Sequence, residues 1–333
     1  MTTETILTGI KPTGRPHLGN YLGMIKPAIE LMQQNKGHDN MLFIANYHAL
    51  NSVQDRQGLR ESTYDVAATL LACGLNPDDV MMYRQSDIPE IMELVTIITS
   101  VTPKGLMDRS HAYKAAVADN LARNADADAD INMGLYTYPI LMAADILTFD
   151  TTIVPVGKDQ VQHVEFARDI AGYFNNTFGK GLVLPAHKVR ESVATVPGLD
   201  GRKMSKSYNN VVPIFDTPAN IEAAVKRIVT DSLRPEEKKD PETNNIYLIY
   251  KSIADPADAA QMAERFRAGG LGYGDAKKML LQRLLDEFQP KFERYQHFMN
   301  NKAEVDALLA AGAVKARAKA QKVLKRVKDI IGA

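Results

Sequence analysis

The sequence is poor in several features that identify other classes of protein. It contains no tryptophan, and it has a single cysteine, Cys73, in 333 residues. One cysteine excludes an internal disulfide and is typical of a reducing compartment, so we expect a cytoplasmic location. No apolar run approaches the roughly 18 residues that cross a bilayer. The N-terminal stretch MTTETILTG lacks the basic and apolar segments of a secretory signal, and we expect no contact with a membrane.

The chain also lacks an excess of charge of either sign. Lys and Arg number 40, and Asp and Glu number 40, so the formal net charge is zero. Any surface that binds nucleic acid must therefore be a local basic patch. A hydrophobic content of 45% and a charged content of 24% are typical of globular proteins, and the length predicts two domains or one domain with an appendage.

The order of the predicted elements indicates an α/β fold. Short apolar runs predict four strands, at 5–9, 40–46, 80–86 and 152–157. Amphipathic spacing predicts helices between the first three, at 17–35 and 61–75. Such alternation is typical of a Rossmann-like, doubly wound parallel sheet, in which ligands bind beyond the carboxyl ends of the strands.

Helical patterns dominate the rest of the chain. Residues 89–150 are mostly helical around a polar loop at 118–132, which lacks the glycine and glutamate of a calcium loop and is expected to be solvated. From residue 213 onward every pattern is helical, which predicts a C-terminal α-helical domain. The apolar helices at 90–107 are a candidate subunit interface or part of the domain core.

The stretch PTGRPHLGNY, residues 12–21, directly follows the first predicted strand. A strand, a turn of small residues and the start of a helix bring backbone N–H groups close to an anion such as a phosphate. The stretch matches neither the dinucleotide pattern GxGxxG nor the phosphate loop GxxxxGK[ST]. It predicts a phosphate-binding turn of another kind.

A second stretch, GLDGRKMSKSYNN at 198–210, is rich in glycine, lysine and serine. This composition predicts a mobile loop on which Lys203 and Lys206 flank Met204 and Ser205. Lysines on such a loop can close on a polyphosphate and offset the charge that develops in a transition state.

Together the two stretches resemble the paired motifs of the class I aminoacyl-tRNA synthetases. HLGN, His17 to Asn20, is similar to the family's His-Ile-Gly-His with asparagine in the last place, and KMSKS stands unchanged. The resemblance implies catalytic roles for His17, Lys203 and Lys206. Lys11 stands where family members often carry glutamine, so its contact with ATP is expected to be ionic. The ATP-binding residues implied in this way are Lys11, Pro12, Thr13, Gly19, Asn20, Gly157, Lys158, Asp159, Val193, Lys203, Met204, Ser205, Lys206 and Ser207.

The segment GLYTYPILMAADIL, residues 134–147, indicates the amino acid. The tyrosyl enzymes have a pattern that resembles Tyr-Pro-x-x-Gln-x-x-Asp, and Met142 replaces the glutamine here. Methionine packs well against a flat aromatic ring, and Asp145 can accept a hydrogen bond from the indole N–H, which is only a donor. An aspartate among apolar residues also needs a partner. The predicted tryptophan-binding residues are Leu7, Tyr47, His48, Tyr138, Met142, Asp145 and Gln160.

A third stretch, GKDQVQHVEFARD at 157–169, follows the fourth predicted strand. In the family the equivalent Gly-x-Asp-Gln contacts the ATP ribose, and its glutamine contacts the ammonium group of the amino acid. His163 and Glu165 lack a third ligand at suitable spacing and are expected to pack and orient this helix, so no metal site is predicted. We expect Mg²⁺ to arrive with ATP.

The resemblance implies ATP-dependent activation of tryptophan and its transfer to tRNA(Trp), by a homodimer with no role for DNA. It divides the chain into a catalytic domain at 1–192 with a helical insertion at about 89–150, the KMSKS loop and linker at 193–212, and an anticodon-binding helical domain at 213–333. The alternatives are a tyrosine–tRNA ligase, a small-molecule nucleotidylyltransferase and an inactive regulatory paralogue. The presence of His17, Lys203 and Lys206 argues against the last.

The C-terminal segment KARAKAQKVLKRVK, residues 315–328, holds seven basic residues and no acidic one. On a helix, the apolar residues from Val323 to Ile331 form a stripe that leaves much of the charge facing water. Two interpretations stay open. The helix docks by its stripe alone, or its basic face, with Lys319, Lys322 and Arg326, also contacts the tRNA backbone.

Overall fold

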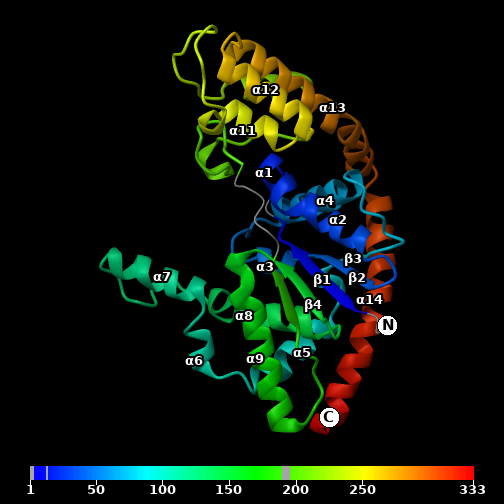
Figure 1. The fold of residues 1–333 in the computed structure, drawn as a ribbon. Helices are drawn as coiled ribbons and strands as arrows, with labels where there is room; N and C mark the ends of the chain where they lie inside the picture. Colours follow the sequence, from blue (N-terminus) through cyan, green and yellow to red (C-terminus); the bar gives the residue numbers. More distant parts are fainter. Residues whose placement is uncertain (1–3, 13, 190–195) are drawn as a thin grey trace.

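The structure is a computed structural model that describes residues 4–12, 14–189 and 196–333. Its centre is a five-stranded sheet in which every pair of neighbouring strands is parallel (Figure 1). The strand order is β3-β2-β1-β4-β5, which confirms the predicted α/β fold. The strands are β1 (Thr5–Ile10), β2 (Asp39–Ile44), β3 (Met81–Arg84), β4 (Ile153–Val156) and β5 (Ala186–Val189).

The four predicted strands are confirmed, and β5 is an addition. Its sequence AHKV has no apolar run, and all four of its residues are exposed. It forms because β4 offers an open edge, with Ile153 paired to Ala186 and Val156 paired to Val189. Only this long-range pairing makes the segment a strand.

The register of the sheet brings three strand ends level. Ile10 pairs with Ile44, and Ile44 pairs with Arg84. The residues that follow each of these ends therefore meet at one edge, where ligands bind in open α/β sheets.

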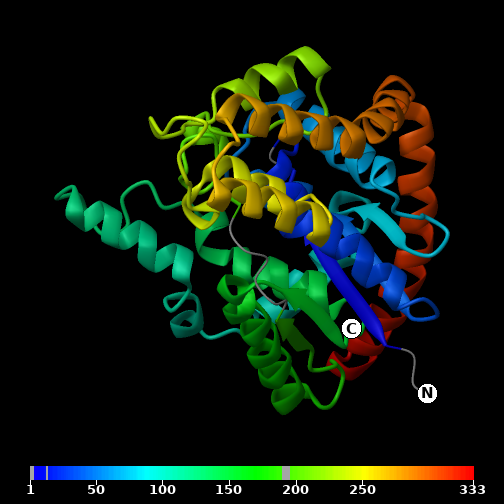
Figure 2. The same ribbon diagram turned by 45° about the horizontal axis from the view of Figure 1, so that its top comes forward.

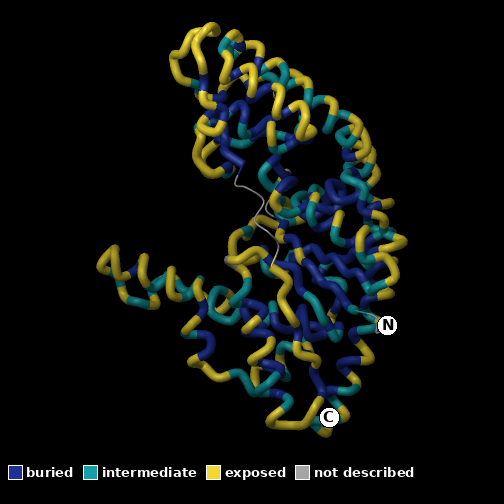
Figure 3. The backbone as a smooth tube through the Cα atoms, viewed as in Figure 1, coloured by how far each residue is buried: buried dark blue, intermediate teal, exposed yellow. Residues whose placement is uncertain are grey.

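Helices cover both faces of the sheet, and the sheet separates two hydrophobic cores. One face packs α2 (Lys26–Gln34) and α4 (Arg56–Ala72), and the other packs α8 (Met133–Leu147) and α9 (Val161–Phe178). Figure 3 shows the buried segments concentrated around the strands and on the inner sides of these helices. Leu7 lies on the second face, in one core with Met41 and Tyr83.

The helix predicted at 17–35 is interrupted. It begins as α1 (Leu18–Asn20), continues as the π-helical turn η1 (Tyr21–Ile25) and ends as α2. Pro27 lacks a backbone N–H and breaks the hydrogen-bond ladder at this point, which explains the wider turn before it.

The helical segment at 89–150 consists of α5 (Glu90–Thr99), α6 (Lys104–Met107), α7 (His111–Ala122) and α8. In Figures 1 and 2, α6 and α7 extend away from the rest of the molecule. The apolar residues Ile91, Leu94 and Ile98 of α5 are buried in the second core, so most of the apolar character of 90–107 belongs to the domain core.

The C-terminal helices do not all stay together. α10 (Pro218–Lys226), α11 (Asn245–Lys251), α12 (Pro256–Ala268) and the first part of α13 (Tyr273–Asn300) form a lobe at the top of Figure 1, whereas α14 (Lys302–Ile331) runs back along the sheet. Gly312 of α14 lies so close to the backbone of Met82 in β3 that a Cβ atom would not fit. By its packing α14 belongs to the α/β part, although the sequence pattern grouped it with the domain at 213–333.

Ion pairs hold α14 in this place. Arg317 forms a two-pronged contact with Glu90, Lys319 pairs with Asp39, and Arg326 pairs with Asp150. The structure therefore favours the docking interpretation of the basic segment over contact with tRNA, because two of the three predicted phosphate ligands already have carboxylate partners. Nothing in the sequence pattern revealed these partners, which lie far along the chain.

Candidate active site

The HLGN turn stands directly beyond β1. Gly14 has a φ of +89°, which lets the chain turn back before His17 starts the helix. The backbone N–H of His17 donates to Asn20 Oδ1 at 3.2 Å, and the N–H of Leu18 donates to the carbonyl of Val212 at 3.0 Å. The turn is therefore fixed both by its own asparagine and by the segment that follows the KMSKS loop.

The KMSKS loop lies against this turn. Met204 is buried, and its Sδ lies 3.3 Å from the backbone N–H of Gly19. A Cβ atom on Gly14 would stand 3.0 Å from Lys206 Nζ, and one on Gly19 would stand 3.1 Å from the ring of His17. A side chain at Gly14 would therefore crowd Lys206 of the KMSKS loop, and one at Gly19 would crowd His17 of its own motif and, at 3.4 Å, Met204 Sδ.

The electrostatics of this junction favour an anion. Burial, with the nearby Lys206 as a second cause, lowers the pKa of His17 to about 4, so the imidazole is neutral at neutral pH. Burial also lowers the pKa of Lys206, and the positive charge of Arg15 adds to the effect, while Asp65 opposes it. The buried Nδ1 of His17 has no hydrogen-bond partner in the described part of the chain. A phosphate group would satisfy both side chains.

Asn210 holds the KMSKS loop in shape, although the sequence did not mark it. Its side chain is 2% exposed; Oδ1 accepts from the N–H of Ser205 at 2.8 Å, and Nδ2 donates to Asp200 Oδ1 at 2.7 Å. Nδ2 also lies 3.2 Å from the carbonyl of Lys203. One amide thus ties together both ends of the loop. Its position three residues after the end of KMSKS was the only signal in the sequence.

A second cluster stands where β2 and β3 end. Asp145 of α8 is 1% exposed, and its Oδ2 lies 2.9 Å from His48 Nε2. Gln85 Nε2 donates to both oxygens of Asp145 at 2.9 Å, and Gln85 Oε1 accepts from the backbone N–H groups of Tyr47 and His48. His48 and Asp145, two of the predicted tryptophan-binding residues, therefore contact each other, and Gln85 joins them.

Gln85 is the residue that sequence reasoning missed in this cluster. It directly follows β3, and a polar residue after a predicted buried strand was an available signal. Burial raises the pKa of Asp145, while the hydrogen bond and charge of His48 and the hydrogen bond of Gln85 act in the opposite direction. An acceptor held in a dry site by fixed donors suits recognition of a single N–H group.

The other residues predicted to bind tryptophan differ in how far they are buried. Tyr138 and Met142 are half-buried on α8, and the hydroxyl of Tyr138 lies 3.3 Å from His163 Nε2. His163 of α9 thus contacts a predicted tryptophan-binding residue of α8, and its orienting role stays a prediction. Leu7 is buried in the sheet, whereas Tyr47, at 37% exposed, lies at the rim.

The predicted ATP contacts after β4 occupy the short 3₁₀ helix η3 (Lys158–Gln160). Gly157, Lys158 and Gln160 are exposed, as are Lys11, Lys203 and Ser207, while Pro12 is buried. Thr13 and Val193 lie outside the described residues, as does the side chain of Asp159. Their predicted roles stay predictions.

The described residues do not offer a resident metal centre. Within residues 4–12, 14–189 and 196–333, no group of three or more His, Cys, Asp or Glu side chains is placed to hold a metal ion. In the same part of the chain, no helix is both long enough and apolar enough to span a membrane.

Comparison with known proteins agrees with this geometry. Residues 2–289 match the family model described as tRNA synthetases class I (W and Y). A tryptophan–tRNA ligase of Pseudomonas putida is 49% identical over 333 residues, covering 99% of this chain and 74% of the relative. One from Neisseria meningitidis is 46% identical over 100% of this chain and 98% of its own length.

A solved structure is similar over its whole length. The tryptophanyl-tRNA synthetase of Campylobacter jejuni, complexed with ADP and tryptophan, has a TM-score of 0.89 at 41% identity and covers 99% of this chain and 100% of its own. Together with the HLGN turn packed on the KMSKS loop, these matches show that the chain belongs to the class I tRNA synthetases for tryptophan and tyrosine, and among them to the tryptophanyl enzymes.

Proposed function

We propose that the chain activates L-tryptophan with ATP and transfers it to tRNA(Trp), which is the activity of a tryptophan–tRNA ligase. The observation that carries this proposal is the arrangement of two sites at one sheet edge. The junction of the HLGN and KMSKS motifs suits a polyphosphate, and Asp145, fixed by His48 and Gln85, suits an indole N–H. The names of the relatives support tryptophan over tyrosine.

In the first step the tryptophan carboxylate attacks the α-phosphate of ATP, and a bond to pyrophosphate breaks. No protein nucleophile is needed, because positioning and charge stabilisation suffice for this kind of transfer. Neutral His17 can hydrogen-bond to phosphate oxygens, and Lys206 and Lys203 can offset the charge on the leaving pyrophosphate.

In the second step the adenylate's carbonyl carbon is attacked by a hydroxyl of the terminal ribose of tRNA, and AMP leaves. The pocket must therefore open to the 3′ end of a nucleic acid while it holds the indole ring. Met142 supplies a polarizable surface for that ring. Gln160 is proposed to bind the ammonium group.

We further propose that Mg²⁺ enters with ATP, bound by phosphate oxygens and water. The described residues fit this role better than a resident metal, because their carboxylates are not gathered into a cage. A homodimer and a cytoplasmic location also stay proposals. Met92, Val95 and Ile97 of α5 pack against the second core but stay half-buried, and they are the residues proposed to meet a second copy.

Pyrophosphate exchange into ATP tests the function directly. We expect exchange that depends on tryptophan and is absent without an amino acid. Exchange that is faster with tyrosine would favour the tyrosyl alternative. Nucleotide transfer that needs neither amino acid but uses another small acceptor would favour a nucleotidylyltransferase.

A further inference from the structure

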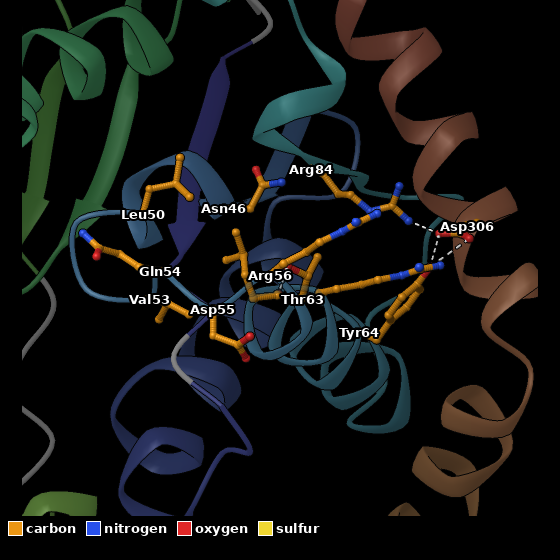
Figure 4. A pocket seen from close by; sticks show the side chains of 12 residues that line it. Asn46, Leu50, Val53, Gln54, Asp55, Arg56, Thr63, Tyr64, Arg84 and Asp306 are labelled. Atoms are coloured by element: carbon orange, nitrogen blue, oxygen red, sulfur yellow. Dashed lines mark hydrogen bonds and ion pairs between the residues drawn. The ribbon is translucent and has the colours of Figure 1, made fainter.

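A cavity of about 640 Å³ is lined by residues of α3 (Asn46–Ala49), of the segment that follows it, and of α4, β3 and α14. Figure 4 shows its side chains gathering from α3, the start of α4, the end of β3 and α14. The volume falls within the range of about 300–1,000 Å³ that is common for ligand sites. None of the residues predicted to bind ATP or tryptophan lines it.

Charged side chains, three of them arginines, line the cavity. Arg56, Arg60 and Arg84 line it, together with the carboxylates of Asp55 and Asp306. Both carboxylates are already engaged. Asp55 accepts from two backbone N–H groups as the N-cap of α4, and Asp306 accepts from Arg84 and from the hydroxyl of Tyr64.

Arg56 and Arg60 thus keep their charge for a ligand. In the part of the chain that the structure describes, neither has a hydrogen bond or carboxylate partner, and Arg60 only lies over the ring of Tyr64 at 5.9 Å. Both side chains are exposed. A guanidinium group can donate two parallel hydrogen bonds to the oxygens of one phosphate. The guanidinium groups of Arg56 and Arg60 therefore favour a phosphate ligand.

The cavity is separate from the ATP junction. Ser62 and Asp65 of α4 face that junction, with Ser62 Oγ 4.0 Å from the Cβ position of Gly14. Arg56, Arg60 and Thr63 lie on a different side of the same helix and line the cavity. α4 therefore stands between two positively charged sites.

The cavity shares a wall with the amino-acid pocket. Within α3, Asn46 lines the cavity and His48 contacts Asp145. At the end of β3, Arg84 lines the cavity and its neighbour Gln85 holds Asp145. A phosphate in the cavity would therefore be separated from the reacting amino acid only by α3 and the end of β3.

We propose that this cavity binds backbone phosphates of the tRNA substrate close to its 3′ end. The proposal rests on the proposed function, which requires that end to reach the amino-acid pocket. The rim is open and its arginines are exposed, which suits a long polyanion that gains affinity by counterion release. Tyr47 of α3 and Leu50, which directly follows α3, are 37% and 47% exposed and offer apolar surface. Single-stranded nucleic acids stack bases on such surfaces.

The test compares the double variant Arg56→Gln/Arg60→Gln with the wild type. We expect the dissociation constant for tRNA(Trp) to rise about 10-fold at moderate salt. Because about 0.7 in slope is lost per single-strand phosphate contact, the logarithmic salt dependence should flatten by about 1.4. Tryptophan-dependent pyrophosphate exchange should stay unchanged. Arg56→Lys/Arg60→Lys, which keeps the charge, should retain most of the salt slope.

A matched control removes the same charge at the opposite edge of the sheet. Lys36 and Lys180 are exposed and precede β2 and β5, so Lys36→Gln/Lys180→Gln should leave tRNA binding unchanged. A tRNA lacking its four 3′-terminal nucleotides should bind the wild type and the arginine variant equally. Equal binding of whole tRNA by both would overturn the proposal, as would a difference that persists on the shortened tRNA.

Two further outcomes also decide it. If AMP or inorganic phosphate binds in an Arg56- and Arg60-dependent manner while tRNA binding is unaffected, the cavity is a small-anion site and the proposal is wrong. Failure of the proposed function would appear differently, as absence of tryptophan-dependent exchange in the wild type. Binding of tRNA is measured without catalysis, so the two failures are distinguishable.

Discussion

Removal of the Asp145 carboxylate should weaken tryptophan recognition, by more when no hydrogen-bond acceptor replaces it than when a neutral acceptor does. An ionised carboxylate has about four lone-pair sites. Three contacts are present, two from Gln85 and one from His48, each at 2.9 Å. One site is left for the indole N–H. Because the group is buried, this bond is not replaced by water when it is lost.

The size of the effect follows from the kind of bond. A hydrogen bond to a charged acceptor contributes about 1.5–3 kcal/mol, and a neutral one about 0.5–1.5 kcal/mol. Asp145→Ala should therefore raise the KM for tryptophan about 10- to 150-fold, while Asp145→Asn, which keeps one carbonyl acceptor, should raise it about 5-fold. The KM for ATP should change little in either variant.

A tryptophan analogue with sulfur in place of the indole N–H isolates the contact. Pyrophosphate exchange is measured for both substrates with the wild type and with Asp145→Ala. We expect the wild type to prefer tryptophan and the variant to lose that preference. If Asp145→Ala lowers the use of both substrates by the same factor, Asp145 only supports the pocket and the indole assignment is wrong.

Four other changes test the remaining parts of the structure. Lys206→Ala should lower kcat for adenylate formation more than it raises KM, because the lysine acts on developing charge; single-turnover pyrophosphate release measures this, and a pure KM effect would contradict it. Asn210→Ala should slow the same step about 10-fold without changing tryptophan affinity, because the N–H of Ser205 and both ends of the loop lose their hydrogen-bond partner. Unchanged single-turnover rates would show that the loop does not need these hydrogen bonds. The buried His17 has a pKa of about 4 against an ordinary value of 6.5, so it stays neutral in the folded state while the unfolded chain gains a proton. The melting temperature should therefore fall as pH drops from 6.5 to 4. His17→Gln should reduce that fall, and an equal fall in both proteins would refute the assignment. Glu90→Ala should lower the free energy of unfolding by about 2 kcal/mol, because Arg317 and Gln321 lose their shared acceptor; a denaturation curve that coincides with the wild type would argue against docking of α14 through this contact.

The local parts of the site could be predicted from the amino-acid sequence. Apolar runs of five to seven residues predicted β1 to β4, because burial of a parallel strand demands such runs. HLGN and KMSKS could be read because a close approach of backbone to phosphate restricts residue types over a few neighbouring positions. Asp145 could be predicted because a carboxylate among apolar residues of a helix needs a partner, and Met142 because it replaces the glutamine of the tyrosyl pattern.

Features that depend on residues far apart in the chain could not be predicted from the sequence. β5 has no apolar pattern and becomes a strand because β4 offers it an edge. Gln85 and Asn210 are ordinary polar residues in the sequence, and they matter because folding places Asp145 beside the first and encloses the second within the KMSKS loop. The basic face of α14 likewise resembled a nucleic-acid surface until Glu90, Asp39 and Asp150 were found opposite it. In each case the physical reason is the same: hydrogen bonds and ion pairs form between groups that the sheet order brings together, and a one-dimensional pattern does not contain that order.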